Sequence, residues 1–396
     1  MGNTGWLQAG AFLSGLACTQ ALADAAPDPG AIEPLKFNLL GFIGTVGGDA
    51  SGAVYTARQS GGIHTTGLTA GAWVEPNLET VFDNAWELGF KGDFLVYHDK
   101  LTGDNYGNDV VEKAYAYLQT LYGRFEIGQQ DGAAYKFVLN GPDIDDLAAI
   151  NDSNLTFFKD KSSGAALNGI FNLRTGVFDS ANDAKISYYI PHFFDLQIGI
   201  SYTPYMAKGG LPWIDQGHHV ANRPENIWEV GANYAGYFGQ YVVRGYGGFA
   251  MAENASPTPG HDALRDYGLA LQIDHPFAGG QFSAGGGWRR SNAYTFDVTQ
   301  PFTHGDTSDW RLGSTYTKGD WSFGLEYDRG AADAHPGLPA LTESGAEASL
   351  GYQLTPNLQL TAGYEHMHFA RGAGTFYNGQ SDVNADAAFL HTQVHI

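Results

Sequence analysis

The chain has 396 residues and a formal net charge of -21, with 54 Gly, 24 Phe, 22 Tyr and 8 Trp. Such an aromatic-rich composition excludes a disordered chain, and the acidic balance argues against nucleic acid as a partner. Beyond residue 23, no stretch approaches the roughly 18 uncharged apolar residues that a membrane-spanning helix needs. The charge fits an extracytoplasmic surface or a pore that favours cations, and also an ordinary acidic soluble protein.

The first 23 residues resemble an export signal. An apolar run from Trp6 to Leu22 ends in the small-x-small triplet Ala21-Leu22-Ala23, although no Lys or Arg precedes the run. We expect a signal peptide over 1–23, a short extension over 24–34 and a single β domain over 35–396. The only cysteine, Cys18, lies in the signal, so the mature chain is expected to have no disulfide, catalytic thiol or cysteine metal site.

Alternating apolar and polar residues predict sixteen strands in the rest of the chain. The predicted ranges are 35–46, 65–76, 84–98, 110–119, 122–130, 182–190, 193–203, 226–236, 239–250, 263–273, 279–290, 308–317, 320–330, 343–353, 358–370 and 386–396. Short connections such as "TLYG" and "KGD" alternate with long polar ones such as "HDKLTGDNYGND". Short turns on one rim and long loops on the other are typical of an antiparallel up-and-down membrane barrel, and closure removes the exposed sheet edges.

The hairpin "DWRLGSTYTKGDWSFGLEYDRG" shows how the two faces of the wall differ. Leu312 and Leu325 share one face with aromatic residues, whereas Arg311 and Glu326 lie on the other. In a membrane barrel the apolar face contacts lipid and the polar face lines a water-filled lumen. A soluble β-sandwich would bury the apolar face instead. Glycines recur on the polar face, where we expect them to leave space for water.

Three stretches carry a resemblance to a known family: "AYAYLQTLYGRFEIGQQDGAAYKF" (114–137), "SANDAKISYYIPHFFDLQIGISYTP" (180–204) and the closing "AAFLHTQVHI". The chain resembles the sixteen-stranded Gram-negative porins of the general diffusion type, although Gln129 and Ile396 stand where the family often has Arg and an aromatic residue. The resemblance implies an outer-membrane homotrimer in contact with lipid and lipopolysaccharide, which passes small hydrophilic solutes and ions. It also implies that the long third loop folds into the barrel.

The segment 131–181 is the expected third loop. Its stretch "GPDIDDLAAIND" contains four acids that the resemblance places at the pore constriction: Asp143, Asp145, Asp146 and Asp152. In the family, acids of this loop face basic residues of the wall. The alternative is that these acids are a solvated helix start, capped by Asp143.

Strand alternation predicts which charged residues of the wall point into the lumen. The predicted inward bases are Lys91, Lys185, Arg244, Arg289 and Arg311, and the predicted inward acids are Glu87, Asp93, Glu229, Asp266, Asp274, Glu326, Glu347 and Glu365. Rings of charged side chains determine ion selectivity. Because acids outnumber bases, the sequence predicts a weak preference for cations.

No catalytic residue, metal site or cofactor is expected, because the chain has no GxSxG, GxGxxG, P-loop or HExxH motif. His366 and His368 are two apart on one strand, where we expect a rim position. A sugar-specific channel remains an alternative, with loop aromatics at Tyr135, Phe137, Phe157, Phe158 and Phe171. A barrel enzyme would need a Ser, a His and an acid grouped on its outer surface, and alternation gives no such group. A soluble carbohydrate-binding β protein is the third alternative.

Overall fold

The computed structural model describes residues 34–60, 62–98, 111–145, 150, 157–158, 175–177, 180–205, 224–254, 263–292, 306–333, 340–371 and 382–396. The expected signal peptide therefore lies outside the described residues, as do Asp146, Asp152 and Phe171. No helix in the described ranges is both long enough and apolar enough to cross a membrane.

The described chain forms one antiparallel sheet that closes on itself. Its elements are β1 (Leu35–Leu39), β2 (Phe42–Gln59), β3 (Ile63–Val81), β4 (Glu87–His98), β5 (Val111–Thr120), β6 (Gly123–Gln129), α1 (Ala133–Lys136), β7 (Ala184–Tyr189), β8 (Leu196–Tyr205), β9 (Pro224–Phe238), β10 (Tyr241–Asn254), β11 (Leu264–Phe277), β12 (Gly280–Ser291), β13 (Thr307–Lys318), β14 (Trp321–Ala332), β15 (Leu341–Thr355), β16 (Leu358–Arg371) and β17 (Asp382–His395). Each strand from β2 onward pairs with the next, and β17 pairs with β2. The barrel therefore has 16 strands, as predicted.

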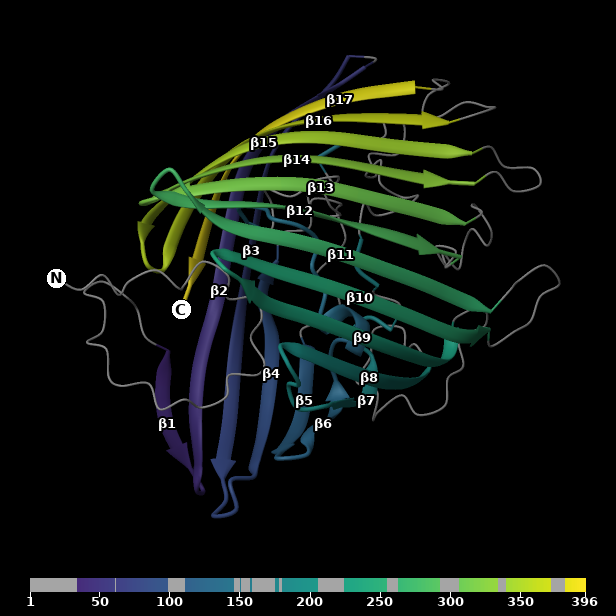
Figure 1. Cartoon of the computed structure of the whole chain (residues 1–396). Helices are drawn as coiled ribbons and strands as arrows, with labels where there is room; N and C mark the ends of the chain where they lie inside the picture. The colour runs from purple at the N-terminus through teal and green to yellow at the C-terminus, as the bar shows by residue number, and fades with distance from the viewer. Residues whose placement is uncertain are drawn as a thin grey trace.

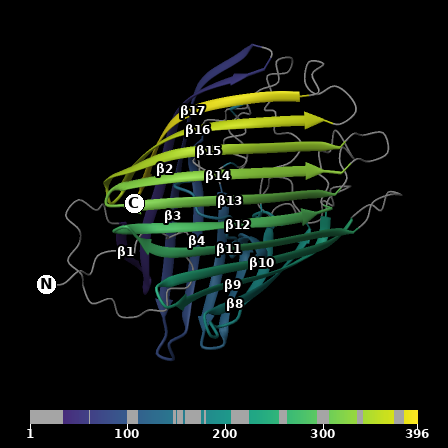
Figure 2. The same cartoon turned by 45° about the horizontal axis from the view of Figure 1, so that its top comes forward.

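Figures 1 and 2 show that β10–β17 cross the opposite wall of β2–β6 at a steep angle. Closing a sheet into a barrel requires such tilted strands. The strand ends that the long connections join lie at the end of the barrel opposite the short turns, as the alternation of connection lengths predicted. The exception is the connection between β2 and β3, which spans only residues 60–62.

The first predicted strand, 35–46, was wrong in detail. The chain turns back at Leu40 and Gly41, whose φ angles are 52° and 88°, and so divides this range into β1 and the start of β2. The 18-residue β2 then continues to Gln59. Its middle stretch "GGDASGA" has small residues on both faces, so the apolar alternation that marks a strand is absent there.

β1 and β17 lie end to end along the same edge of β2. β1 pairs with residues 42–46 of β2, and β17 pairs with residues 49–59. At the junction, Ile396 and Gly48 exchange two backbone hydrogen bonds of 3.1 and 2.9 Å. β1 thus covers the stretch of the β2 edge that β17 is too short to reach.

The two faces of the wall are as the alternation predicted. On the outside, Leu312 is 57% exposed and Leu325 is 48% exposed, and Trp310 packs against Tyr327 with ring centroids 5.3 Å apart. On the inside, Arg311 and Glu326 are buried, because a loop covers them. An apolar exterior with charged residues confined to the interior is the arrangement that a lipid environment requires.

Candidate functional site

The candidate site is the segment between β6 and β7, residues 130–183, which we call loop three. Its first element is α1, which contacts β7, β8, β9 and β10 from inside the barrel. The backbone N–H of Ala133 donates to Ser201 Oγ at 2.8 Å, and Lys136 Nζ donates to both carboxylate oxygens of Glu126 at 2.6 and 2.7 Å. Loop three therefore folds inward from its first residues.

Glycines on the inner wall allow loop three to lie directly on the strands. A Cβ at Gly231 would come within 2.1 Å of the carbonyl oxygen of Ala133, and one at Gly313 would come within 2.6 Å of that of Pro142. Only glycine permits so close an approach of two backbones. The space that we expected these inward glycines to leave for water is thus occupied by loop three.

Two of the four predicted loop acids are described, and both contact the wall. Asp143 forms an ion pair with Arg311 of β13 at 3.3 Å, and its side chain remains 35% exposed. Asp145 lies 3.1 Å from Nδ1 of His391 on β17, and both side chains are buried. The structure therefore brings these two acids to Arg311 and His391 of the barrel wall.

Arg311 itself is a junction between the loop and the wall. Besides Asp143, it contacts Glu326 at 2.5 Å and Asp328 at 3.8 Å on the neighbouring strand. Only 2% of its side chain is exposed. Its positive charge is shared among three carboxylates and is covered by protein. Arg311 therefore holds loop three to the wall and contributes little to the surface that faces the water path.

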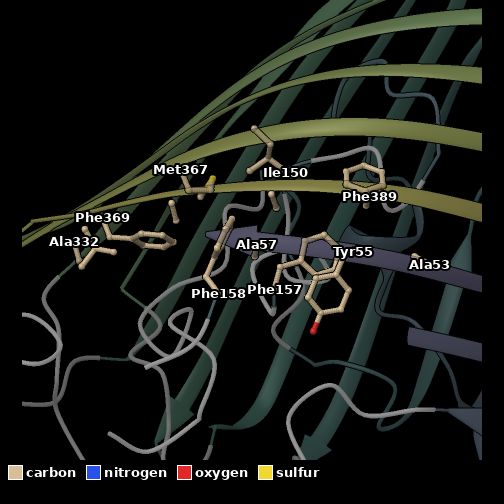
Figure 3. Close-up of a cluster of buried hydrophobic side chains, with 13 residues drawn as sticks. Ala53, Tyr55, Ala57, Ile150, Phe157, Phe158, Ala332, Met367, Phe369 and Phe389 are labelled. Atoms are coloured by element: carbon tan, nitrogen blue, oxygen red, sulfur yellow. The ribbon is translucent and has the colours of Figure 1, made fainter. Parts of the chain in front are cut away.

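The far part of loop three packs into an apolar cluster on β2, β14, β16 and β17 (Figure 3). Phe157 stacks on Tyr55 with centroids 4.4 Å apart, and Phe158 meets Phe369 edge-on at 6.1 Å. Ile150 packs in the same cluster, and its N–H donates to Glu326 Oε1 at 2.9 Å. This apolar cluster is composed of Ala53, Tyr55, Ala57, Ile150, Phe157, Phe158, Ala332, Met367, Phe369, Val383, Ala385, Ala387 and Phe389.

Four of the five loop aromatics that a sugar-specific channel could use are described: Phe171 lies outside the described residues, and Tyr135 is half-buried. Phe157 and Phe158 are 0% exposed and Phe137 is 5% exposed, so none of them offers its ring to a solute in the lumen. A sugar-specific channel would need such exposed rings at its constriction. These three side chains instead attach loop three to the wall, because apolar rings leave water by packing against one another.

Three of the other predicted wall bases lie beside acids or backbone carbonyls. Arg244 pairs with Asp274 at 3.2 Å, and Arg289 forms a close bidentate pair with Asp266. Lys185 is buried and donates to backbone carbonyls at the ends of loop three. Lys91 is half-buried on β4, where it is opposite Asn77 and Tyr115 in the register of the sheet.

Sequence reasoning missed a charged cluster at the start of loop three. Glu126 accepts from Arg124 Nε at 2.6 Å as well as from Lys136, and the Arg124 guanidinium lies 3.8 Å above the ring of Tyr117. Burial lowers the pKa of the Lys136 amine, although the ion pair with Glu126 opposes this effect. The alternation of Arg124 and Glu126 in "GRFEIGQQ" was the signal that could have placed both side chains inside the barrel.

The wall formed by β3 and β4 carries a group of half-buried acids: Glu75, Glu79, Glu87 and Asp93. Tyr117 Oη donates to Glu87 Oε1 at 2.8 Å and lies 3.2 Å from Glu79 Oε2, so these two carboxylates are held at the inner surface. Glu87 thus lies on the inner surface, and Asp93 is half-buried on the same strand. Lys91 is the predicted inward base of this region.

The described residues contain no group of three His, Cys, Asp or Glu side chains with the geometry to hold a metal ion. His366 is exposed on β16 and lies 2.8 Å from Asp386, whereas His368 lies 3.7 Å from Asp382. Both histidines are close to the loop end of β16, in keeping with the rim position that we expected.

The model of the Gram-negative porin family matches residues 9–372 of this chain. The chain belongs to the Gram-negative porins. No curated protein matches its sequence. As a member of this family with a closed barrel, the porin is an outer-membrane channel.

Solved structures of similar fold agree with this assignment. The outer membrane channel DcaP of Acinetobacter baumannii superposes with a TM-score of 0.59 at 12% identity, covering 92% of the porin and 100% of DcaP. OmpF of Salmonella typhi gives 0.55 at 13% identity, with 91% and 100% covered. In-vitro folded OmpT of Vibrio cholerae, in a trimer form, gives 0.52 at 13% identity, with 89% and 99% covered. At these identities the likeness shows the fold alone.

Proposed function

We propose that the porin is a passive channel for small hydrophilic solutes and ions, with a weak preference for cations, and that it catalyses no reaction. The observation that carries this proposal is the path of loop three. It lies on the inner wall at Gly231 and Gly313 and contacts β13 and β17 through Asp143 and Asp145. A loop held in this way narrows the lumen.

The cation preference follows from which charges stay accessible. Arg289 and Arg311 are neutralised by buried carboxylates, so they contribute little field to the water path. Glu75, Glu79, Glu87 and Asp93 remain half-buried on β3 and β4, and Asp143 remains partly exposed on loop three. Negative charge on both sides of the lumen raises the local concentration of cations.

We further propose that the porin is a homotrimer that reaches the outer membrane after removal of residues 1–23, and that it contacts lipopolysaccharide there. Support for the trimer comes from the outer face of β17, β2 and β3, where the small residues Ala388, Gly52 and Ala70 alternate with the exposed Leu390, Val54 and Leu68. Small residues let two surfaces approach closely within lipid. The trimer form of OmpT is consistent with this assembly.

Planar bilayer recording tests the channel and its selectivity together. Residues 24–396, refolded in detergent, are expected to give stepwise conductance and a reversal potential of cationic sign in a KCl gradient. Glu79→Gln with Glu87→Gln should move the reversal potential toward zero. Asp320→Asn, at the exposed turn between β13 and β14, is the matched control and should change nothing. A folded barrel that forms no channels would refute the proposed channel function. A reversal potential of anionic sign would refute the proposed cation preference.

A further inference from the structure

The two ends of loop three meet at a place that we call the neck, formed by Gln130 after β6 and by Ser180 and Ala181 before β7. Lys185, on β7, is 2% exposed, and its amine lies among the backbone carbonyls of these residues. It donates to Gln130 O in a very short contact, to Ala181 O at 2.6 Å and lies 3.4 Å from Ser180 O. One side chain thus joins the first and last residues of the loop.

Glu229 on β9 contacts the neck from the other side. Its side chain is buried, and Oε1 accepts from the backbone N–H of Ser180 at 2.9 Å. A Cβ at Gly132 would collide with the same carboxylate, at 1.5 Å from Oε2, so the carboxylate also lies directly against the first residues of the loop. A buried cation and a buried anion therefore bind complementary backbone groups at one place.

The free-energy cost of burying the charges of Lys185 and Glu229 indicates that these two residues contribute something other than stability. Removing two ions from water costs several kcal/mol, and an apolar pair of similar size is often as stable. At the neck, however, the loop backbone leaves the sheet, and its polar groups have no strand to pair with. A buried backbone group without a partner is itself costly. Lys185 and Glu229 supply those partners and so fix the direction in which loop three leaves the wall.

We propose that Lys185 and Glu229 are positioning residues that set where loop three crosses the lumen, and through it the conductance of the channel. This inference rests on the proposed channel function. Neither side chain is exposed enough to touch a permeating ion, since 2% and 1% of their surfaces are accessible. Their effect on ion flow is therefore indirect and depends on the loop.

The test uses Lys185→Met, Glu229→Gln and the double variant, with Lys318→Met at an exposed turn as the matched control. The reporter is Val177→Cys, because Val177 is 0% exposed and lies three residues before Ser180 of the neck. The only native cysteine, Cys18, lies in the expected signal peptide and is absent from residues 24–396, so the reporter is the only thiol in the refolded protein. The measurements are the labelling rate by a maleimide, the single-channel conductance and the heat-modifiable migration that reports a folded barrel.

We expect the double variant to form a folded barrel. Its channels should show several conductance levels, whereas the wild type should show a single level. Labelling at Val177→Cys should become about tenfold faster or more, as expected from the loss of a hydrogen bond to a charged group. Lys185→Met alone leaves the Glu229 charge buried without its cation and can therefore fail to fold. If it does, the labelling rates and conductances of the double variant and of Glu229→Gln test the inference.

Wild-type conductance together with slow labelling in the folded double variant would overturn the inference. A merely structural pair would lower the unfolding temperature of the barrel and leave both readouts unchanged. If the wild-type protein formed no channels, the proposed function would fail, whereas the labelling rate would still report whether the neck positions the loop.

Discussion

Removing the two phenylalanine rings that hold the far part of loop three should release it from the wall. Phe157 and Phe158 are both fully buried, and each packs against aromatic side chains of β2, β16 or β17. Truncating a buried Phe to Ala costs about 3–5 kcal/mol. Even about 3 kcal/mol shifts the ratio of released to attached loop by roughly a hundredfold, since 1.4 kcal/mol corresponds to a factor of ten.

The assay is single-channel recording of Phe157→Ala with Phe158→Ala, compared with Phe323→Ala. Phe323 is 46% exposed on the outer face of β14, so its removal weakens the barrel without touching loop three. The double variant should show a higher and more variable conductance, while the control keeps the wild-type level. Unchanged conductance in a folded double variant would refute the view that the apolar cluster holds the loop.

Three further changes test other contacts. Asp143→Asn should move the reversal potential toward zero while the barrel stays folded, because Arg311 keeps Glu326 and Asp328; an unchanged potential would place Asp143 away from the ion path. Gly231→Val should push α1 off β9 and lower stability by about 1–3 kcal/mol, seen as a lower temperature of heat-modified migration. Gly245→Val, where a Cβ would have no neighbour nearer than 3.9 Å, is its control, and equal temperatures would contradict the close approach at α1. The Leu269 side chain is 58% exposed on the outer face of β11. Leu269→Lys should therefore lower the free energy of unfolding, measured with guanidinium in lipid vesicles, by about 2–4 kcal/mol. An unchanged free energy of unfolding would argue against lipid contact at this position.

Much of the barrel could be predicted because its wall follows a period of two. Wherever large apolar residues alternate with polar ones, as in β13 and β14, the predicted strand and its faces were confirmed. The prediction failed for β2 beyond Val46, where small residues on both faces give no contrast between inside and outside. Alternation depends on side-chain volume, so a strand without large side chains carries little signal.

The site was less predictable, because its contacts join residues far apart in the chain. The alternation placed Arg311 and Lys185 on the inner face, but it could not show that Asp143 reaches one of them or that the other is covered by loop ends. The path of an irregular loop is set by many weak contacts, none of which is periodic. Likewise, the burial of Phe157 against Tyr55 depends on a partner 102 positions earlier, which no local pattern reveals.

The seam between β17 and β2 has a consequence for how the chain folds. Residues 385–395 pair with residues 59–49, so these contacts join the first and last strands of the closed barrel, which are far apart in the sequence. Folding rates fall as contacting residues lie further apart in sequence, because the entropy of the intervening chain must be lost first. Joining this seam is therefore expected to be the slow step of folding, and a nascent chain that lacks its last strand would keep two unpaired edges exposed. Closure of the barrel should accordingly wait until β17 is present to pair with both β16 and β2.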